Sequence, residues 1–163
     1  METVGADAVV PPRPTWRSAL RLWRARRRPR LEVGAGVRIG PDVVLRAEPG
    51  ARLVVGAGAA LGRGARLEAR GGTLRVGAGA AIGDRAAVVG AVTVGPECVI
   101  GEWARAEGSA RLDARARLAA HAVALSGARV GAGAVVGSYA VVDGAVAARS
   151  VVRGQTRAPR SSS

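Results

Sequence analysis

The sequence predicts an all-β protein in which the chain winds as a parallel β-helix, a coil built from short strands and tight turns. Three observations predict this fold. An apolar residue recurs every six positions, a small residue follows it four positions later, and aromatic residues make up only 2% of the 163 residues. So few aromatic side chains would leave an ordinary globular core poorly filled. We therefore expect a narrow interior lined by Val, Leu, Ile and Ala.

The apolar column runs from Val76 to Ala148, and ten of its thirteen positions are Val, Ile or Leu. A helix cannot use this period, because six residues at about 100° each rotate by about 240° and spread the column over three faces. Short strands separated by turns place both columns inside, and the many Gly residues supply turn conformations with positive φ. The column consists of Val76, Ile82, Val88, Val94, Ile100, Ala106, Leu112, Leu118, Ala124, Val130, Val136, Val142 and Ala148.

Two earlier runs carry the same repeat in other phases, one from Val33 to Leu45 and one from Val55 to Leu67. The phase changes at Glu-Pro-Gly and Gly-Gly sequences, which are typical of turns. We interpret these sites as small loops at the corners of one continuous solenoid. The predicted divisions are a basic N-terminal segment, 1–32, a β-helix, 33–148, and a C-terminal cap with a disordered tail, 149–163.

Residues 15–28 have helical spacing and hold much of the basic charge. Trp16, Ala19, Leu20 and Trp23 share one face, whereas arginines occupy another, so the spacing predicts an amphipathic helix that ends at a proline. This helix either lies on an anionic membrane surface or covers the open first coil, whose free edges would otherwise pair with another chain. No nucleic-acid-binding motif accompanies the charge, so specific nucleic-acid binding is not expected.

Units such as Ile39-Gly-Pro-Asp-Val-Val, Val76-Gly-Ala-Gly-Ala-Ala and Val130-Gly-Ala-Gly-Ala-Val resemble those of the bacterial hexapeptide-repeat acyltransferase family, over roughly residues 33–154. The pattern is most similar to polysaccharide-type O-acetyltransferases. The resemblance implies a left-handed β-helix with three hexads per coil, about six coils, and a homotrimer. It also implies transfer of an acetyl or other acyl group from acyl-CoA to a hydroxyl or amine of a sugar or sugar-linked acceptor, such as a lipid-linked saccharide.

With three hexads per coil, residues 18 positions apart stack on one corner. One such column is Arg85, Trp103, His121 and Tyr139, which includes the only histidine and the only tyrosine of the chain. In the family, acyl-CoA lies along such an edge between subunits. The resemblance therefore makes His121 a candidate general base, with Trp103 and Tyr139 as walls of the groove.

The phosphates of acyl-CoA call for cationic partners. Arg85 is one candidate, and Arg153 and Arg157 near the C-terminus are others, since arginine pairs well with phosphate. Two simpler interpretations stay open. His121 could be an ordinary turn residue, because Gly fills its slot in other hexads, and the column could be a stabilising stack at the trimer seam.

One stretch departs from the family pattern. The polysaccharide acyltransferases usually carry a histidine on a loop where this chain reads Glu107-Gly-Ser-Ala. Glu107 and Asp113 are therefore alternative bases, and Cys98, in the small column, is expected in the core rather than as a nucleophile. A single histidine cannot form the multi-histidine zinc site of the carbonic anhydrases that share this fold, so no metal is expected. The alternative function is a non-catalytic β-helix scaffold or assembly subunit that has lost the histidine loop.

The composition also bears on location and partners. The chain has a formal net charge of +13, and every one of its 25 basic residues is arginine. Such a charge favours anionic partners. The single cysteine gives no sign of an oxidising compartment, and no secretory signal or membrane-spanning run is evident. We expect a cytoplasmic protein, with a peripheral position on the inner face of the membrane as the alternative.

Overall fold

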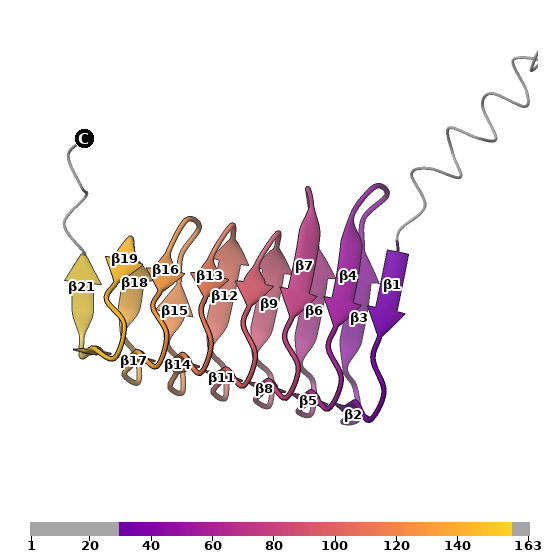
Figure 1. Ribbon diagram of the computed structural model, residues 1–163, viewed down its shortest axis with the longest axis horizontal. Coiled ribbons are helices and arrows are strands. Elements are labelled where there is room, and N and C mark those ends of the chain that lie inside the picture. The colour runs from indigo at the N-terminus through magenta and orange to yellow at the C-terminus, as the bar shows by residue number, and fades with distance from the viewer. Residues whose placement is uncertain (1–29, 158–163) are drawn as a thin grey trace, which may run out of the picture.

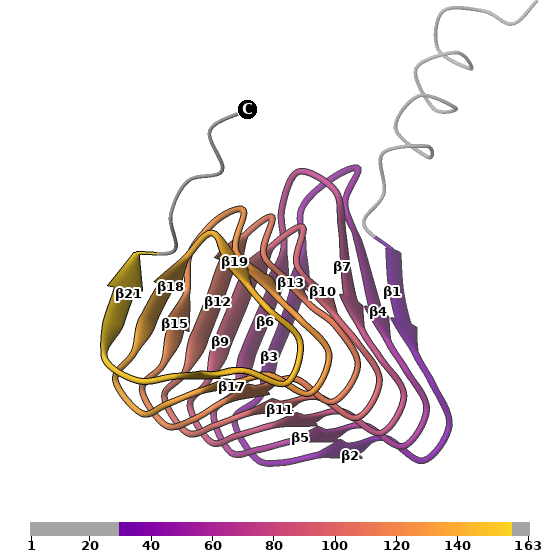
Figure 2. The same ribbon diagram turned by 60° about the vertical axis from the view of Figure 1, so that its left-hand side comes forward.

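Three parallel sheets form the sides of a triangular prism in the computed structural model, which describes residues 30–157 (Figures 1 and 2). Each coil contributes one strand to each sheet in turn, so that strands distant in sequence become hydrogen-bonded neighbours. In Figure 2 the C-terminal coil is nearest the reader. Followed from the N-terminus, the chain comes toward the reader and turns clockwise, so the winding is left-handed. The predicted fold class, an all-β left-handed parallel β-helix, is confirmed.

The sheets are named A, B and C in the order in which the chain meets them. Sheet A contains β1 (Arg30–Val33), β4 (Arg52–Val55), β7 (Thr73–Val76), β10 (Thr93–Val94), β13 (Arg111–Leu112), β16 (Arg129–Val130) and β19 (Ala145–Val146). Sheet B contains β2 (Arg38–Ile39), β5 (Ala60–Leu61), β8 (Ala81–Ile82), β11 (Val99–Ile100), β14 (Arg117–Leu118), β17 (Val135–Val136) and β20 (Val151–Val152). Sheet C contains β3 (Val44–Ala47), β6 (Arg66–Ala69), β9 (Ala87–Gly90), β12 (Arg105–Gly108), β15 (Val123–Ala124), β18 (Val141–Asp143) and β21 (Gln155–Arg157).

The described chain makes seven coils, one more than expected, and its strands reach beyond the predicted range 33–148 at both ends. Residues 151–157, predicted as part of a cap and tail, form the last strands of sheets B and C. In β21 the hexad pattern has faded, but Gln155 pairs with Val141 and Thr156 with Val142. Backbone hydrogen bonds to the preceding coil therefore extend the sheet where the side chains no longer signal a strand. The predicted helix at 15–28 lies outside the described residues.

The step between paired strands decides which residues become neighbours. Arg30 pairs with Arg52, a step of 22 residues, whereas Thr93 pairs with Arg111, a step of 18. The first two coils are longer because they carry the predicted loops at 48–50 and 71–72, between sheets C and A. From sheet A's β7 onward the step stays at 18 through β16, so the central coils superpose residue on residue.

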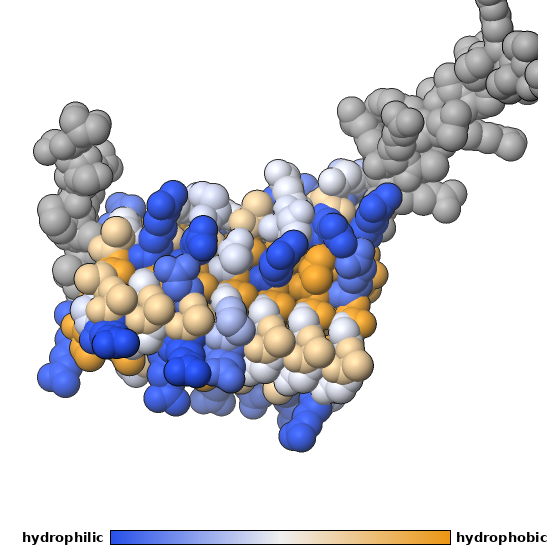
Figure 3. Space-filling model, viewed as in Figure 1, coloured by the Kyte–Doolittle hydropathy of each residue, from blue (hydrophilic) through white to orange (hydrophobic). Residues whose placement is uncertain are grey.

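Both predicted columns face inward and are buried except at the last apolar position. Ala148 is exposed, because the step shortens to 16 residues there and Val146 pairs with Val130 in its place. Ile100 and Leu112 of the apolar column are 0% exposed, and so are Ala104 and Ala116 of the small column. The small residues occupy positions at the corners, where the triangular cross-section is narrowest. Outward residues alternate with the buried ones along each strand, and Figure 3 shows strongly hydrophilic side chains standing among small and apolar ones on one face. No described segment forms a helix long and apolar enough to cross a bilayer.

Shortening a core side chain should be costly, because neighbouring coils are hydrogen-bonded at a set spacing and cannot collapse into the space. We expect Ile100→Ala to lower the free energy of unfolding by about 2–5 kcal/mol. The matched control is Val99→Ala in the same strand, whose side chain points outward and is only half-buried. Urea titration followed by circular dichroism measures both. Equal losses would contradict the inward assignment of this column.

Candidate functional site

One corner of the prism, between sheets B and C, repeats the same turn in four successive coils. Arg85, Trp103, His121 and Tyr139 occupy the same turn position with φ between 56° and 62°. Each turn is tied to the one before it. The backbone N–H of His121 donates to the carbonyl of Glu102 at 2.9 Å, and the other turns make the same bond. Bulky residues rarely adopt positive φ, and such strain persists where other interactions compensate for it.

The four side chains stack in one column, as the 18-residue step predicts. The rings of Trp103 and His121 are nearly parallel, with centroids 6.2 Å apart. His121 and Tyr139 are equally parallel at 4.7 Å, and the guanidinium carbon of Arg85 lies 5.2 Å from the Trp103 ring centroid. Each aromatic contact of this kind contributes about 0.5–1.5 kcal/mol beyond burial, and the cation–π contact about 0.5–1 kcal/mol at an exposed site.

The stack leaves His121 open to a ligand through its ring edge rather than its faces. Both faces of His121 are covered by its neighbours, so its ring nitrogens point sideways from the column. Trp103 and Tyr139 are still 48% and 69% exposed. A molecule lying along this corner would therefore meet a row of ring edges, with the basic nitrogen of His121 in the middle of the row.

The two C-terminal arginines fall at different places. Arg153 follows β20 at the same corner as the stack. It lies next to Gly137, which precedes the Tyr139 turn: the Cα of Arg153 is 3.8 Å from the position that a Cβ on Gly137 would occupy. Arg157 pairs through its backbone with Asp143, at the far end of β21. The structure thus brings Arg153 close to the stack and places Arg157 across sheet C from it.

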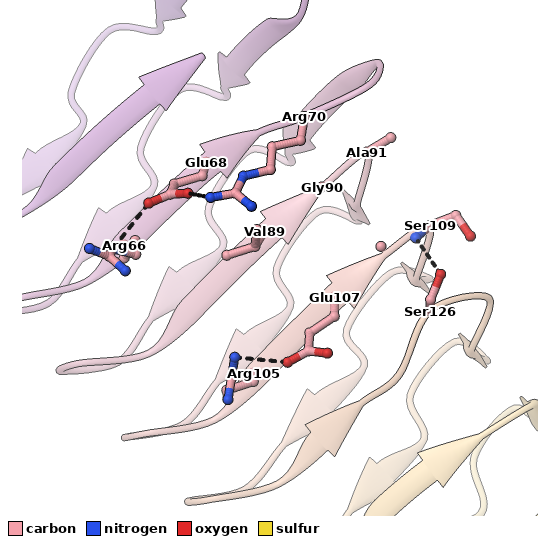
Figure 4. Close-up of a pocket in the computed structure, with 11 residues that line it drawn as sticks. Arg66, Glu68, Arg70, Val89, Gly90, Ala91, Arg105, Glu107, Ser109 and Ser126 are labelled. Atoms are coloured by element: carbon pink, nitrogen blue, oxygen red, sulfur yellow. Dashed lines mark hydrogen bonds and ion pairs between the residues drawn. The ribbon is translucent and has the colours of Figure 1, made fainter. Parts of the chain in front are cut away.

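A depression with a volume of about 690 Å³ lies over the outer face of sheet C, at the edge that leads to sheet A (Figure 4). At the bottom of the depression successive coils are in close contact at Gly90 and Gly108, where an added Cβ would collide with the next coil. We call this depression the sheet C groove. It is lined by Arg66, Glu68, Arg70, Val89, Gly90, Ala91, Arg105, Glu107, Gly108, Ser109 and Ser126.

Charged pairs line the groove in two coils. Glu68 points outward yet is only 3% exposed, because its carboxylate is held by Arg66 at 3.2 Å and by Arg70 at 2.6 Å. In β12, Arg105 contacts Glu107 at 2.9 Å. The three arginine side chains are each more than half exposed, so they keep donors free for a ligand.

The stack and the groove belong to the same face of the prism. From the turn before β12 into the strand, the successive outward residues are Trp103 at the corner, then Arg105, then Glu107 in the groove. Four residues of extended chain separate the two ends, a distance of about 13 Å. A ligand of moderate length could therefore contact both.

The two alternative bases named from sequence are separated by the fold. Glu107 lies in the sheet C groove, whereas Asp113 lies at the corner between sheets A and B, where it accepts a hydrogen bond from Arg111. Cys98 is fully buried, and its thiol donates to the carbonyl of Asp113 at 2.9 Å. Desolvation raises the pKa of this thiol, so the thiolate that a nucleophile needs is disfavoured. Within residues 30–157, no three His, Cys, Asp or Glu side chains converge as a metal site would require.

Sequence reasoning missed Glu68 and its arginines. A signal was present, because Arg66, Glu68 and Arg70 alternate with apolar residues, which places all three on the outer side of one strand. Sequence spacing does not reveal that Glu68 and Glu107 lie in one row, two coils apart, because the step between coils changes from 21 to 18 residues there. Only the register of the sheet shows it: Glu68 pairs with Val89, which pairs with Glu107.

The chain was compared with known proteins. No family model matches it, and no curated protein matches it. Among solved structures it is similar to an Arabidopsis UDP-N-acetylglucosamine acyltransferase, with 16% identity over 78% of this chain and 69% of that one, at a TM-score of 0.39. A Bacillus cereus protein assigned as an acetyltransferase has 16% identity over 80% and 76%, at 0.42. A Campylobacter jejuni UDP-N-acetylglucosamine acyltransferase has 12% identity over 78% and 72%, at 0.42. At this identity and TM-score they assign neither a family nor an activity to this chain.

Removing the buried carboxylate of the groove should destabilise the protein. We expect Glu68→Ala to cost about 1–3 kcal/mol of unfolding free energy, because two guanidinium groups lose their shared partner. Glu107→Ala, with a 35% exposed carboxylate and one arginine partner, should cost less than about 1 kcal/mol. Urea titration of both variants tests this, and a larger loss in Glu107→Ala would contradict it.

Proposed function

We propose that this protein is an acyltransferase that moves an acetyl or other acyl group from acyl-CoA to a hydroxyl or amine of a sugar or sugar-linked acceptor. The observation that carries the proposal is the exposed Arg85–Trp103–His121–Tyr139 stack, which aligns a cation, two aromatic walls and a base along one corner. The family resemblance of the repeat supports the same class of reaction.

The residues of the corner fit the parts of acyl-CoA. Arg85 supplies charge-assisted donors for a phosphate, and it lies two coils, or about 10 Å, from His121. The edge of Trp103 lies between them and contacts the arm that carries the thioester. Arg153, beside the Tyr139 turn, is a second phosphate-binding residue, and Arg157 is a third on the far side of sheet C.

His121 acts as the general base. Its ring is held between Trp103 and Tyr139, which sets the direction of the edge nitrogens. One nitrogen takes the proton from the acceptor hydroxyl or amine as the acceptor attacks the thioester carbonyl carbon. The same proton then passes to the leaving thiolate when the carbon–sulfur bond breaks, so the histidine returns to its neutral form.

The sheet C groove binds a more distant part of the acceptor. Arginine donors, the Glu107 carboxylate and two serine hydroxyls provide the mixture of donors and acceptors that a saccharide needs. The protein acts as a homotrimer in which a neighbouring subunit closes the corner. It works in the cytoplasm, with the basic segment 15–28 able to bring it to an anionic membrane that holds a lipid-linked acceptor.

A second function, a non-catalytic scaffold or assembly subunit, is favoured by a different observation. The first coil exposes Leu31, Val33 and Ile39, whose equivalents in later coils are buried. Such an end can associate with another protein surface without any chemistry at the corner.

Binding of acetyl-CoA distinguishes the two functions. By calorimetry we expect saturable binding at one molecule per chain, weakened about 10-fold or more by Arg85→Ala, which removes a charge-assisted contact, and also by Trp103→Ala. Arg129→Ala on sheet A is the matched control, since it removes the same charge from another face. Binding of acetyl-CoA no stronger than that of ATP, or equal losses in both arginine variants, would indicate charge attraction alone and favour the scaffold.

The role of His121 is tested by turnover. We expect His121→Ala to lower kcat about 10²–10⁴-fold while leaving the Kd for acetyl-CoA nearly unchanged, because a general base acts in the transition state. Glu107→Gln is the comparison, since it alters the alternative base. Full activity of His121→Ala with loss in Glu107→Gln would move the reaction centre to the sheet C groove.

A further inference from the structure

The first coil leaves an apolar surface open at the N-terminal end of the prism. Leu31, Val33 and Ile39 point inward in phase with the core, yet they are 52%, 44% and 52% exposed. Their register partners one coil later, Leu53, Val55 and Leu61, are 0%, 1% and 3% exposed. Among residues 30–157, no coil lies above them. The backbone groups of β1, β2 and β3 on that side are also unpaired within the described chain, since these strands end their sheets.

We propose that this open end is covered by residues 15–28 of the same chain, through the face formed by Trp16, Ala19, Leu20 and Trp23. The proposal is independent of the acyltransferase function. It concerns which surface the apolar face of the basic segment meets, and the arginines on the other face stay available to an anionic membrane.

Chain connectivity supports this occupant. Residue 29 is a proline, and β1 begins at the next residue, so the segment joins the prism at its open end. A segment tethered this closely has a high effective concentration at that surface, which a separate partner must exceed. Pro29 also prevents a helix from running straight into β1, and so allows a change of direction there.

The dimensions agree as well. A 14-residue helix is about 21 Å long. One side of a coil is a hexad, which spans at most about 20 Å when extended. The helix is therefore long enough to cross the open triangle, and two tryptophans and a leucine can meet the three exposed side chains at its centre.

The charge of the first coil does not oppose this arrangement. Residues 30–51 contain three arginines and three carboxylates, so their formal charge is zero although the chain as a whole carries +13. A strongly basic segment would be repelled by most of this protein but not by this end. With the apolar face turned inward, the arginines of the segment face solvent. The carboxylates are Glu32, Asp42 and Glu48.

Paired cysteines in the full-length chain test the contact. In a Cys98→Ala background, which restores the alanine common in that column, Leu20→Cys is combined with Leu31→Cys, Val33→Cys or Ile39→Cys. We expect an intramolecular disulfide in at least one pair under mild oxidation, because a covering helix brings Cα atoms within about 7 Å. Leu20→Cys with Val151→Cys, an exposed apolar position in the last coil, is the matched control and should not cross-link. Disulfides only between chains would overturn the proposal in favour of end-to-end association of two copies.

Tryptophan emission provides a measurement that does not depend on disulfide geometry. In a Trp103→Tyr background, Trp16 and Trp23 are the only tryptophans, and excitation at the red edge of the absorption band selects them over tyrosine. We expect emission at short wavelength that shifts to the red in Ile39→Asp but not in Val151→Asp. Emission that is typical of exposed tryptophan, unaffected by Ile39→Asp and shifted to the blue only by phosphatidylserine vesicles, would overturn the proposal and assign the segment to the membrane surface.

Discussion

Parallel hydrogen bonding between successive coils is the constraint on which the rest of this structure depends. Each coil is held to the next at the spacing of neighbouring strands, and the step in sequence decides which side chains lie one above another. Where the step is 18 residues, every turn sits on an equivalent turn. The inner columns then form a continuous apolar interior, and the outer positions form straight rows. A core of small residues is enough to fill the interior, because each inner coil is covered above and below by another.

The same constraint produces the stack at the corner between sheets B and C. Four non-glycine residues with positive φ are held in register by backbone bonds from turn to turn, which brings a cation and three rings into one column. Stacking covers both faces of His121 and leaves its edge open, so this ring presents its nitrogen atoms rather than a flat surface. This favours a role for His121 through its nitrogen, with Trp103 and Tyr139 as supports that hold the ring.

The sheet C groove lies at the place where the length of the coils changes. The first two coils have longer turns between sheets C and A, and the following coils pass that corner with less chain. The sheet C groove lies where the longer turn after β6 gives way to the shorter turns after β9 and β12, and its glycines allow the coils to approach closely. A regular solenoid would present a flat face here. Glu68, Arg105 and Glu107 line this one depression.

The repeat in the sequence by itself determined the fold class, the inward columns and the burial of Cys98, because a six-residue period repeated over so many units requires short strands separated by turns. The column through His121 also needed the three hexads per coil that the family resemblance implies. Handedness came from the family resemblance rather than from the period. The extent of the last coil was missed, since β21 pairs through its backbone while its side chains have lost the pattern. Only the tertiary structure decided that Glu68 is buried between two arginines, that Asp113 lies on another corner, and that Arg153 and Arg157 are far from equivalent. These facts depend on the changing step between coils, which sets neighbours across a sheet and leaves little trace in any local stretch of sequence.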